Sequence, residues 1–186
     1  MRIVAGKAGG RRIDVPQKGT RPMSERVRES VFSSLETLFD FPGARVLDLY
    51  SGSGSLGLEA WSRGAEHVTF VESDRNAARM LRRNAANVGL TGVRVEQVRA
   101  ESFASGAPDE PYDLVLVDPP YAMEHEKLQA LLDDLARWTA PEGLIILERQ
   151  SRSPEPTWNP PLEPFRTRSY GGTVVYWGLR PGTSAQ

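Results

Sequence analysis

Asp118, Pro119, Pro120 and Tyr121 stand directly after Tyr112–Val117, an apolar run that predicts a buried strand. The two prolines fix the backbone and lack amide hydrogens, so this segment is rigid and presents acceptors to a ligand. An exocyclic amine on a nucleic-acid base is a poor nucleophile, because its lone pair is delocalised into the ring. The Asp118 carboxylate and the Pro119 carbonyl can hold the amine hydrogens and aim the lone pair at a methyl group. Tyr121 can stack on the base, so these residues predict catalysis on a planar NH2 group.

A second group of residues favours the binding of a nucleoside cofactor. Gly52, Gly54 and Gly57 form a G-x-G-x-x-G run between a predicted strand at 45–49 and a predicted helix at 55–63. Such small residues let backbone N–H groups and a helix N-terminus approach a ligand closely. Glu72 ends the next predicted strand, where a carboxylate can accept both hydroxyls of a ribose. Taken alone, this pattern also fits a nicotinamide-dependent dehydrogenase.

Asp48 changes the choice of cofactor. This carboxylate ends the first predicted strand, four residues before Gly52, where it would repel a pyrophosphate. It suits a ligand that carries an α-ammonium group and a sulfonium. S-adenosyl-L-methionine carries both groups and has no phosphate, so we expect it to be the cofactor.

The elements that position these residues alternate along the chain. Strands are predicted at 45–49, 67–71, 93–98, 112–117 and 143–148, and helices at 55–63, 75–88 and 127–139. Another helix begins near Ser24, a possible N-cap. This alternation predicts an α/β protein whose mostly parallel sheet is flanked by helices on both faces. Short hairpins are predicted at both ends, over 2–15 and 165–179, and the proline-rich segment 151–164 is excluded from any central strand.

Composition excludes several classes of protein. The chain has 186 residues, which predicts one domain, and it has no cysteine, so disulfides and thiolate chemistry are excluded. Two histidines without ligand spacing do not predict a zinc centre, and no metal is expected. No apolar run is long enough for a membrane helix, and the N-terminus lacks a signal peptide, so a cytoplasmic protein is expected.

Charge is distributed unevenly along the chain. The net charge is −1, yet residues 1–30 contain eight basic and three acidic residues. A basic N-terminal segment before an acidic body suits an enzyme that acts on nucleic acid, although a solvated charged face would explain the same residues. The residues expected to hold phosphates are Arg11, Arg12, Lys18, Arg21, Arg26 and Arg28.

These motifs carry a resemblance to known families. The run from Asp48 to Gly57, together with Glu72, resembles motif I and its successor in class I S-adenosylmethionine-dependent methyltransferases. The Asp118–Tyr121 segment resembles the signature of enzymes that methylate exocyclic or amide nitrogens. More widely, the chain resembles RsmD-type bacterial 16S ribosomal RNA guanine-N2 methyltransferases in the segments Arg2–Gly6, Gly10–Ile13, Arg21–Phe32 and Tyr170–Thr173. Met23 and Ser33 depart from that pattern, where Thr and Asn are expected.

The resemblance implies a Rossmann-like class I methyltransferase fold with a seven-stranded sheet and a closing antiparallel hairpin. It implies a basic β-hairpin arm at 1–22, a methyltransferase domain at 23–180 and a flexible tail at 181–186. Asp48 would lie near the methionine amine, Glu72 would hold the ribose and Glu101 would bond the adenine amine. The residues expected at the cofactor are Asp48, Tyr50, Ser51, Gly52, Ser53, Gly54, Gly57, Glu72, Ser73, Glu101, Ser102 and Asp118.

The implied activity is methylation of a guanine N2 amine in 16S ribosomal RNA, within the small ribosomal subunit or its precursor. The implied enzyme is a monomer that uses neither a metal nor a membrane. A different planar amine, such as adenine N6 or a glutamine amide, is the alternative substrate, although no extra target-recognition domain fits in this length. Two different classes of protein also fit parts of the pattern, a nicotinamide oxidoreductase and a non-catalytic RNA-binding module.

Overall fold

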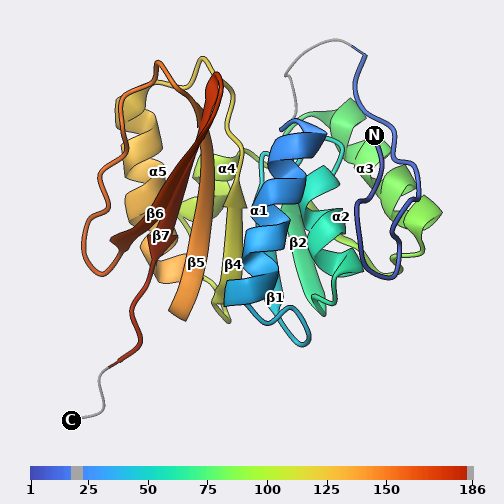
Figure 1. Ribbon diagram of the computed structural model, residues 1–186, viewed down its shortest axis with the longest axis horizontal. Helices are drawn as coiled ribbons and strands as arrows, with labels where there is room; N and C mark the ends of the chain where they lie inside the picture. Colours follow the sequence, from blue (N-terminus) through green and yellow to red (C-terminus); the bar gives the residue numbers. More distant parts are fainter. Residues whose placement is uncertain (18–22, 184–186) are drawn as a thin grey trace.

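A seven-stranded sheet forms the centre of the computed structural model, which describes residues 1–17 and 23–183 (Figure 1). The strand order is β3-β2-β1-β4-β5-β7-β6. Strands β1 to β5 are parallel to their neighbours within that group, whereas β7 pairs antiparallel with β5 and β6. The strands are β1 (Arg45–Leu49), β2 (His67–Val71), β3 (Arg94–Glu96), β4 (Tyr112–Val117), β5 (Thr139–Gln150), β6 (Glu163–Tyr170) and β7 (Thr173–Leu179). The predicted mostly parallel sheet with a closing antiparallel hairpin is confirmed.

Helices cover both faces of this sheet, because successive strand residues point to opposite sides. Val46 packs with α1 and α2 on one face, and Phe70 packs with α3 on the same side. Leu47 packs with α4 and α5 on the other face. The helices are α1 (Glu25–Leu38), α2 (Ser55–Ser62), α3 (Arg75–Val88), α4 (Ala100–Ala104) and α5 (His125–Trp138). Among the described residues, no helix is long and apolar enough to span a membrane.

Most of the predicted elements are found near their predicted bounds. Ser24 is the N-cap of α1 and accepts a hydrogen bond from the Val27 amide, as its type and position indicated. The short helix α4 was missed. Strand β5 is longer than predicted, because Pro141 lies where the register with β4 shifts and no regular ladder bond is needed. Pro164 is accommodated in β6 because that strand is the edge of the sheet.

The N-terminal segment packs on the domain. Its two extended stretches form one antiparallel bridge, between Arg2 and Arg12, in place of the longer hairpin ladder that was predicted. Ile3, Ala8 and Ile13 are buried in a cluster with residues of α2 and α3. The predicted boundary between arm and domain falls at residues that the structure does not describe, and it stays a prediction.

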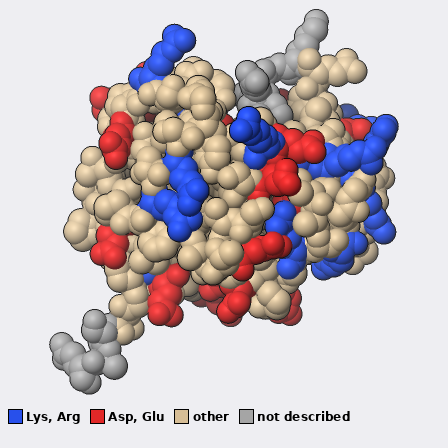
Figure 2. Space-filling model, viewed as in Figure 1, with Lys and Arg blue, Asp and Glu red and all other residues tan. Residues whose placement is uncertain are grey.

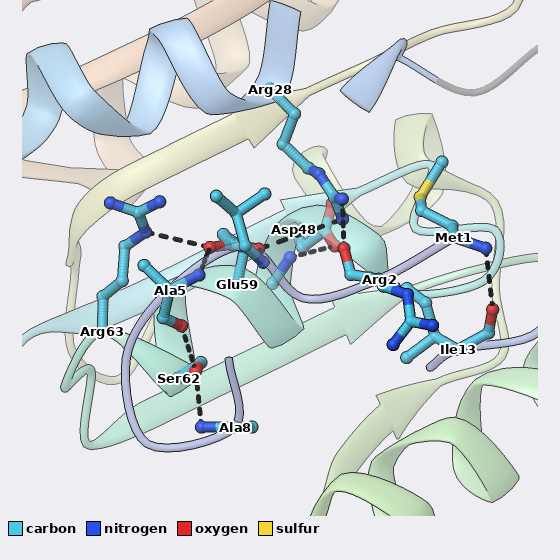
Figure 3. Close-up of polar contacts among 12 residues, drawn as sticks. Met1, Arg2, Ala5, Ala8, Ile13, Arg28, Asp48, Glu59, Ser62 and Arg63 are labelled. Carbon is cyan, nitrogen blue, oxygen red and sulfur yellow. Dashed lines mark hydrogen bonds and ion pairs between the residues drawn. The ribbon is translucent and has the colours of Figure 1, made fainter. Parts of the chain in front are cut away.

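A buried ionic network attaches this segment to the helices (Figure 3). The Glu59 carboxylate, which is fully buried on α2, accepts hydrogen bonds from the amides of Val4 and Ala5 at 2.9 and 3.1 Å. Arg63 donates to the same carboxylate, and Arg28 lies 4.0 Å from it while donating to the carbonyl of Arg2. Since Arg28 has no exposed surface, the prediction that it holds RNA phosphates is wrong.

Replacing Glu59 by Gln should lower the free energy of unfolding by about 3 kcal/mol, because Arg28 would keep a buried charge without its counter-ion. Urea unfolding at pH 7 measures the loss. The matched control is Glu36→Gln, since Glu36 also pairs with Arg63 but is half exposed. The control should cost less than about 1 kcal/mol. Equal losses in the two variants would show that the buried pair contributes nothing special.

Candidate functional site

A cavity, called the main cavity below, lies at the carboxyl ends of β1, β2 and β4, where the strand order reverses and ligands of open α/β sheets bind. Its volume is about 410 Å³. Two distant parts of the sequence meet here, the glycine loop after β1 and the Asp118–Tyr121 segment after β4. The predicted site residues that line the cavity are Asp48, Tyr50, Ser51, Gly52, Ser53, Glu72, Ser73, Asp118, Pro119, Pro120 and Tyr121.

The glycines of the loop have different roles. Gly52 lines the cavity with φ +53°, and a Cβ there would meet no atom within 4 Å. Gly57 lies behind the cavity wall, where a Cβ would collide with the Phe70 ring. Gly54 likewise packs against Leu81 and does not line the cavity. Gly54 and Gly57 therefore shape the loop and seat α2 against the sheet, while Gly52 leaves room for a ligand.

Asp48 is a buried carboxylate that is only half satisfied. Its Oδ2 accepts a hydrogen bond of 2.9 Å from the Gly57 amide, whereas Oδ1 has no hydrogen-bond partner among the described residues. The pKa of Asp48 is raised to about 8: burial is the largest cause, the Gly57 amide opposes the rise, and the charges of Asp118 and Glu72 add to it. A cationic group in the cavity would satisfy this side chain.

Glu72 is held in place by two backbone amides. Its Oε2 accepts a hydrogen bond of 2.7 Å from Gly52, and its Oε1 accepts one of 2.8 Å from Asp74. The carboxylate is thus fixed beside the glycine loop at the cavity wall. Each oxygen keeps a second lone pair, with which it can accept a hydroxyl of a ligand.

Glu101 and Ser102 do not line the cavity. They lie on α4, where Glu101 accepts a hydrogen bond of 3.1 Å from the hydroxyl of Tyr50, a cavity residue. Burial raises the pKa of Tyr50 above its ordinary value, and the neighbouring Glu101 adds to the rise. Glu101 is therefore connected to the cavity through Tyr50. The predicted contact of Glu101 with the adenine amine stays a prediction.

Asp118 is half-buried and makes two hydrogen bonds. Burial raises the pKa of Asp118 to about 7, while bonds to the Met23 backbone and the Glu148 side chain oppose the rise. The loop that follows is anchored by Arg149, which donates to the carbonyls of Pro120 and Met123 at 3.2 and 3.0 Å. The carboxylate therefore stands on a rigid segment at the cavity edge.

Glu148 and Arg149 were missed in the sequence analysis. Both are buried on β5, and the parallel pairing of β4 with β5 brings them to the same edge as Asp118. The predicted strand at 143–148 already placed Glu148 at a carboxyl end. The sequence did contain an indication of their importance, because the charged residues Glu148 and Arg149 directly follow the apolar run at 143–147.

A second cavity, of about 450 Å³, adjoins the main cavity at Tyr121. Tyr121 lines both cavities and is the residue that their linings share. The other lining residues are Ser24, Val27, Glu148, Gln150, Ser151, Arg152, Tyr170, Gly172 and Thr173.

The predicted RNA-binding residues fall into three groups. Arg12 and Arg26 are exposed, and Arg11 is exposed but donates a hydrogen bond of 2.7 Å to the Val88 carbonyl at the end of α3. Lys18 and Arg21 lie outside the described residues, and Arg28 is buried in the ionic network with Glu59. Figure 2 shows further basic side chains over α3, at the right of the view. Helix α3 carries four exposed arginines, Arg75, Arg79, Arg82 and Arg83.

Comparison with known proteins agrees with this site. A family model described as "Conserved hypothetical protein 95" matches residues 1–178. Ribosomal RNA small subunit methyltransferase D from Escherichia coli K12 is 37% identical over 160 residues, which cover 84% of this chain and 78% of that protein. The chain belongs to this family, and the predicted membership of the RsmD family is confirmed.

Two further comparisons support the RsmD assignment. The protein of the same name from Haemophilus influenzae is 32% identical over 160 residues, which cover 83% of this chain and 81% of that protein. The solved structure of the Escherichia coli protein yhhF has a TM-score of 0.86 at 32% identity, covering 98% of this chain and 99% of that one. The fold of that putative methyltransferase thus extends over nearly the whole chain.

The Asp48→Asn variant should change how stability depends on pH. The folded-state pKa of about 8 lies above the ordinary value of 3.8, so the folded protein binds this proton more tightly and loses stability as pH rises between the two values. The variant lacks this proton. It should be more stable than the wild type by about 1 kcal/mol or more at pH 8, with the difference vanishing near pH 4. Thermal unfolding at several pH values tests this, and parallel stability curves would contradict it.

Proposed function

We propose that this protein transfers the methyl group of S-adenosyl-L-methionine to the exocyclic N2 amine of a guanine in 16S ribosomal RNA. The observation that carries the proposal is the single cavity that joins Asp48 and Glu72 to Asp118 and Pro119. One part of this cavity suits a cationic nucleoside, and the other presents acceptors for an amine. The names of the relatives, small subunit ribosomal RNA methyltransferases, supply the class of substrate.

The residues present fit the cofactor. The unpartnered Oδ1 of Asp48 would accept the α-ammonium group, which would offset the cost of burying this carboxylate. Glu72, fixed by two amides, would accept the ribose hydroxyls, and Gly52 leaves the space that the ligand needs. When bound, the sulfonium supplies an electrophilic methyl group. A pyrophosphate would instead meet the carboxylates of Asp48, Glu72 and Asp118, which disfavours a nicotinamide cofactor.

The residues after β4 would activate the amine. The Asp118 carboxylate and the Pro119 carbonyl would each accept one amine hydrogen, which directs the nitrogen lone pair into the main cavity. The nitrogen must lose one proton as it gains carbon, and a base whose pKa is about 7 is well matched to take it near neutral pH. The Tyr121 ring would stack on the guanine. Neither a metal nor a covalent enzyme intermediate is needed for these steps.

The substrate must offer an accessible base. A guanine paired within a helix cannot present its N2 amine to Asp118, which is half-buried in the cavity, so the target would be flipped out or held in a loop. The exposed arginines Arg12 and Arg26 would contact nearby phosphates. We place the reaction in the cytoplasm, on a monomeric enzyme that acts on the small subunit or its precursor.

Tritium transfer from labelled S-adenosylmethionine to unmethylated small-subunit RNA, located by mass spectrometry of the RNA, tests the proposal. Label on a guanine N2 is the expected result, and DNA in place of RNA should remain unlabelled. Calorimetry should detect binding of S-adenosylhomocysteine and not of NAD. Label on adenine N6 or on protein would replace the guanine assignment with one of those substrates.

The Asp118→Ala variant should lose methyl transfer by about a hundredfold to a thousandfold, because the amine would lose an acceptor that is in place before the reaction. S-adenosylhomocysteine affinity should change by less than about fivefold, since Asp48 and Glu72 remain. Asp109→Ala, in the exposed loop before β4, is the control and should keep full activity. Normal transfer by the Asp118 variant would indicate a non-catalytic role for this segment.

The double variant Arg12→Ala, Arg26→Ala should bind RNA about tenfold more weakly at low salt. The slope of log affinity against log salt should become shallower by about 1.4, the value for two lost contacts to single-stranded RNA. Filter binding at a series of salt concentrations measures both. Arg94→Ala, at the opposite end of the strands, is the matched control. An unchanged slope would remove these arginines from the interface.

A further inference from the structure

Two carboxyl groups, of the half-buried Asp118 and the buried Glu148, stand side by side toward the carboxyl ends of β4 and β5. Val117 of β4 pairs with Leu147 of β5, so the next residue along each strand is acidic, Asp118 on one and Glu148 on the other. Their side chains share a hydrogen bond. Two carboxyl groups can form such a bond when one of them carries a proton between the two. The other oxygen of each carboxyl group can then accept a hydrogen bond from a ligand, so Asp118 and Glu148 offer two neighbouring acceptors.

Glu148 connects this pair to the second cavity. Its side chain lines that cavity and is 3% exposed, while Tyr121 forms the wall shared with the main cavity. The volume of about 450 Å³ lies within the range of small-ligand sites, so the space can hold a base. The exposed Arg152 lies on the lining of the same cavity, where it could meet a phosphate of the attached chain.

Glu148 is the buried acceptor among the groups around this cavity. The hydroxyl of Tyr170 is hydrogen-bonded to Ser30 at 2.9 Å. Gln150 is partly exposed, and Arg152 is a donor. Because Arg149 anchors the carbonyls after Pro119, the Tyr121 wall is fixed relative to β5. The floor and the wall of the cavity are therefore preorganised.

The chemistry of this arrangement distinguishes purines. Guanine carries a ring N1–H donor next to its N2 amine, so its edge presents a row of donors. Adenine presents an N1 lone pair next to its N6 amine, and an acceptor facing that lone pair would be repelled. An amine held by Asp118 would place the neighbouring ring position opposite Glu148.

We propose that Glu148 accepts the N1–H of the target base and thereby makes the enzyme specific for guanine. This inference rests on the proposed function, because it assumes that Asp118 holds the N2 amine. The second cavity is then the pocket for the target base, with Tyr121 stacked on one side of the base. Glu148 is a specificity-determining residue that touches the substrate.

The test compares RNAs in which the target guanine is replaced by an analogue. 2-Aminopurine keeps the amine but has a lone pair at N1 and lacks O6, whereas 6-thioguanine keeps both the amine and the N1–H. The wild type should prefer guanine over 2-aminopurine by at least about a hundredfold in kcat/KM. 6-Thioguanine should remain within about tenfold of guanine, which controls for the loss of O6.

Two substitutions separate the acceptor from the shape of Glu148. Glu148→Met keeps the length and removes the acceptor, so transfer to guanine should fall by about tenfold or more and the preference over 2-aminopurine should drop below about tenfold. Glu148→Gln should restore the preference to within about threefold of the wild type, because its NH2 would donate to Asp118 and its oxygen would accept N1–H. Glu142→Gln, at the other end of β5, is the control and should match the wild type.

The outcomes are distinguishable. Equal rates on guanine and 2-aminopurine RNA in the wild type would overturn the proposal without any variant. An unchanged preference in a Glu148→Met protein that still binds S-adenosylhomocysteine would also overturn it. A wild type that transfers nothing to guanine RNA would instead refute the proposed function.

Discussion

The site depends on a carboxylate that the fold buries without fully satisfying it. Asp48 ends β1 in the middle of the sheet, where the Gly57 amide bonds one oxygen and no described residue bonds the other. Gly57 makes this possible, since any side chain there would push α2 away from Phe70. Burial of this group costs stability, and a cation in the cavity would return that stability as binding energy. The same feature that weakens the free protein thus favours a positively charged ligand.

Parallel pairing then concentrates acids at one edge. Four adjacent strands, in the order β2-β1-β4-β5, carry an acidic residue at or just beyond their carboxyl ends: Glu72, Asp48, Asp118 and Glu148. Such a cluster repels phosphate, so a nucleic acid is held by positive charge elsewhere and inserts a neutral base. The exposed arginines of α1 and the N-terminal segment meet that requirement, and the basic face of α3 extends it.

Features carried by local sequence could be predicted. The glycine loop, the strand before Asp118 and the cap at Ser24 all depend on neighbours within a few residues. Arg28 could not be placed, because its burial depends on Glu59, thirty-one positions away, and on the carbonyl of Arg2. Glu148 was missed for a related reason, since its importance follows from the register between β4 and β5. The position of Glu101 also depends on a distant residue. The family resemblance implied that Glu101 bonds the adenine amine, but Glu101 does not line the cavity and instead accepts a hydrogen bond from Tyr50, which does.

The position of Tyr121 in the walls of both cavities has a practical consequence. Two ligands that occupy cavities sharing one wall residue can be joined covalently by a short linker. A bisubstrate inhibitor built from an adenosyl group and a purine would make the second binding event intramolecular, at a high effective concentration. Its selectivity would come from the pairing of the two halves, since other methyltransferases that bind the adenosyl half would lack a matching pocket for the purine.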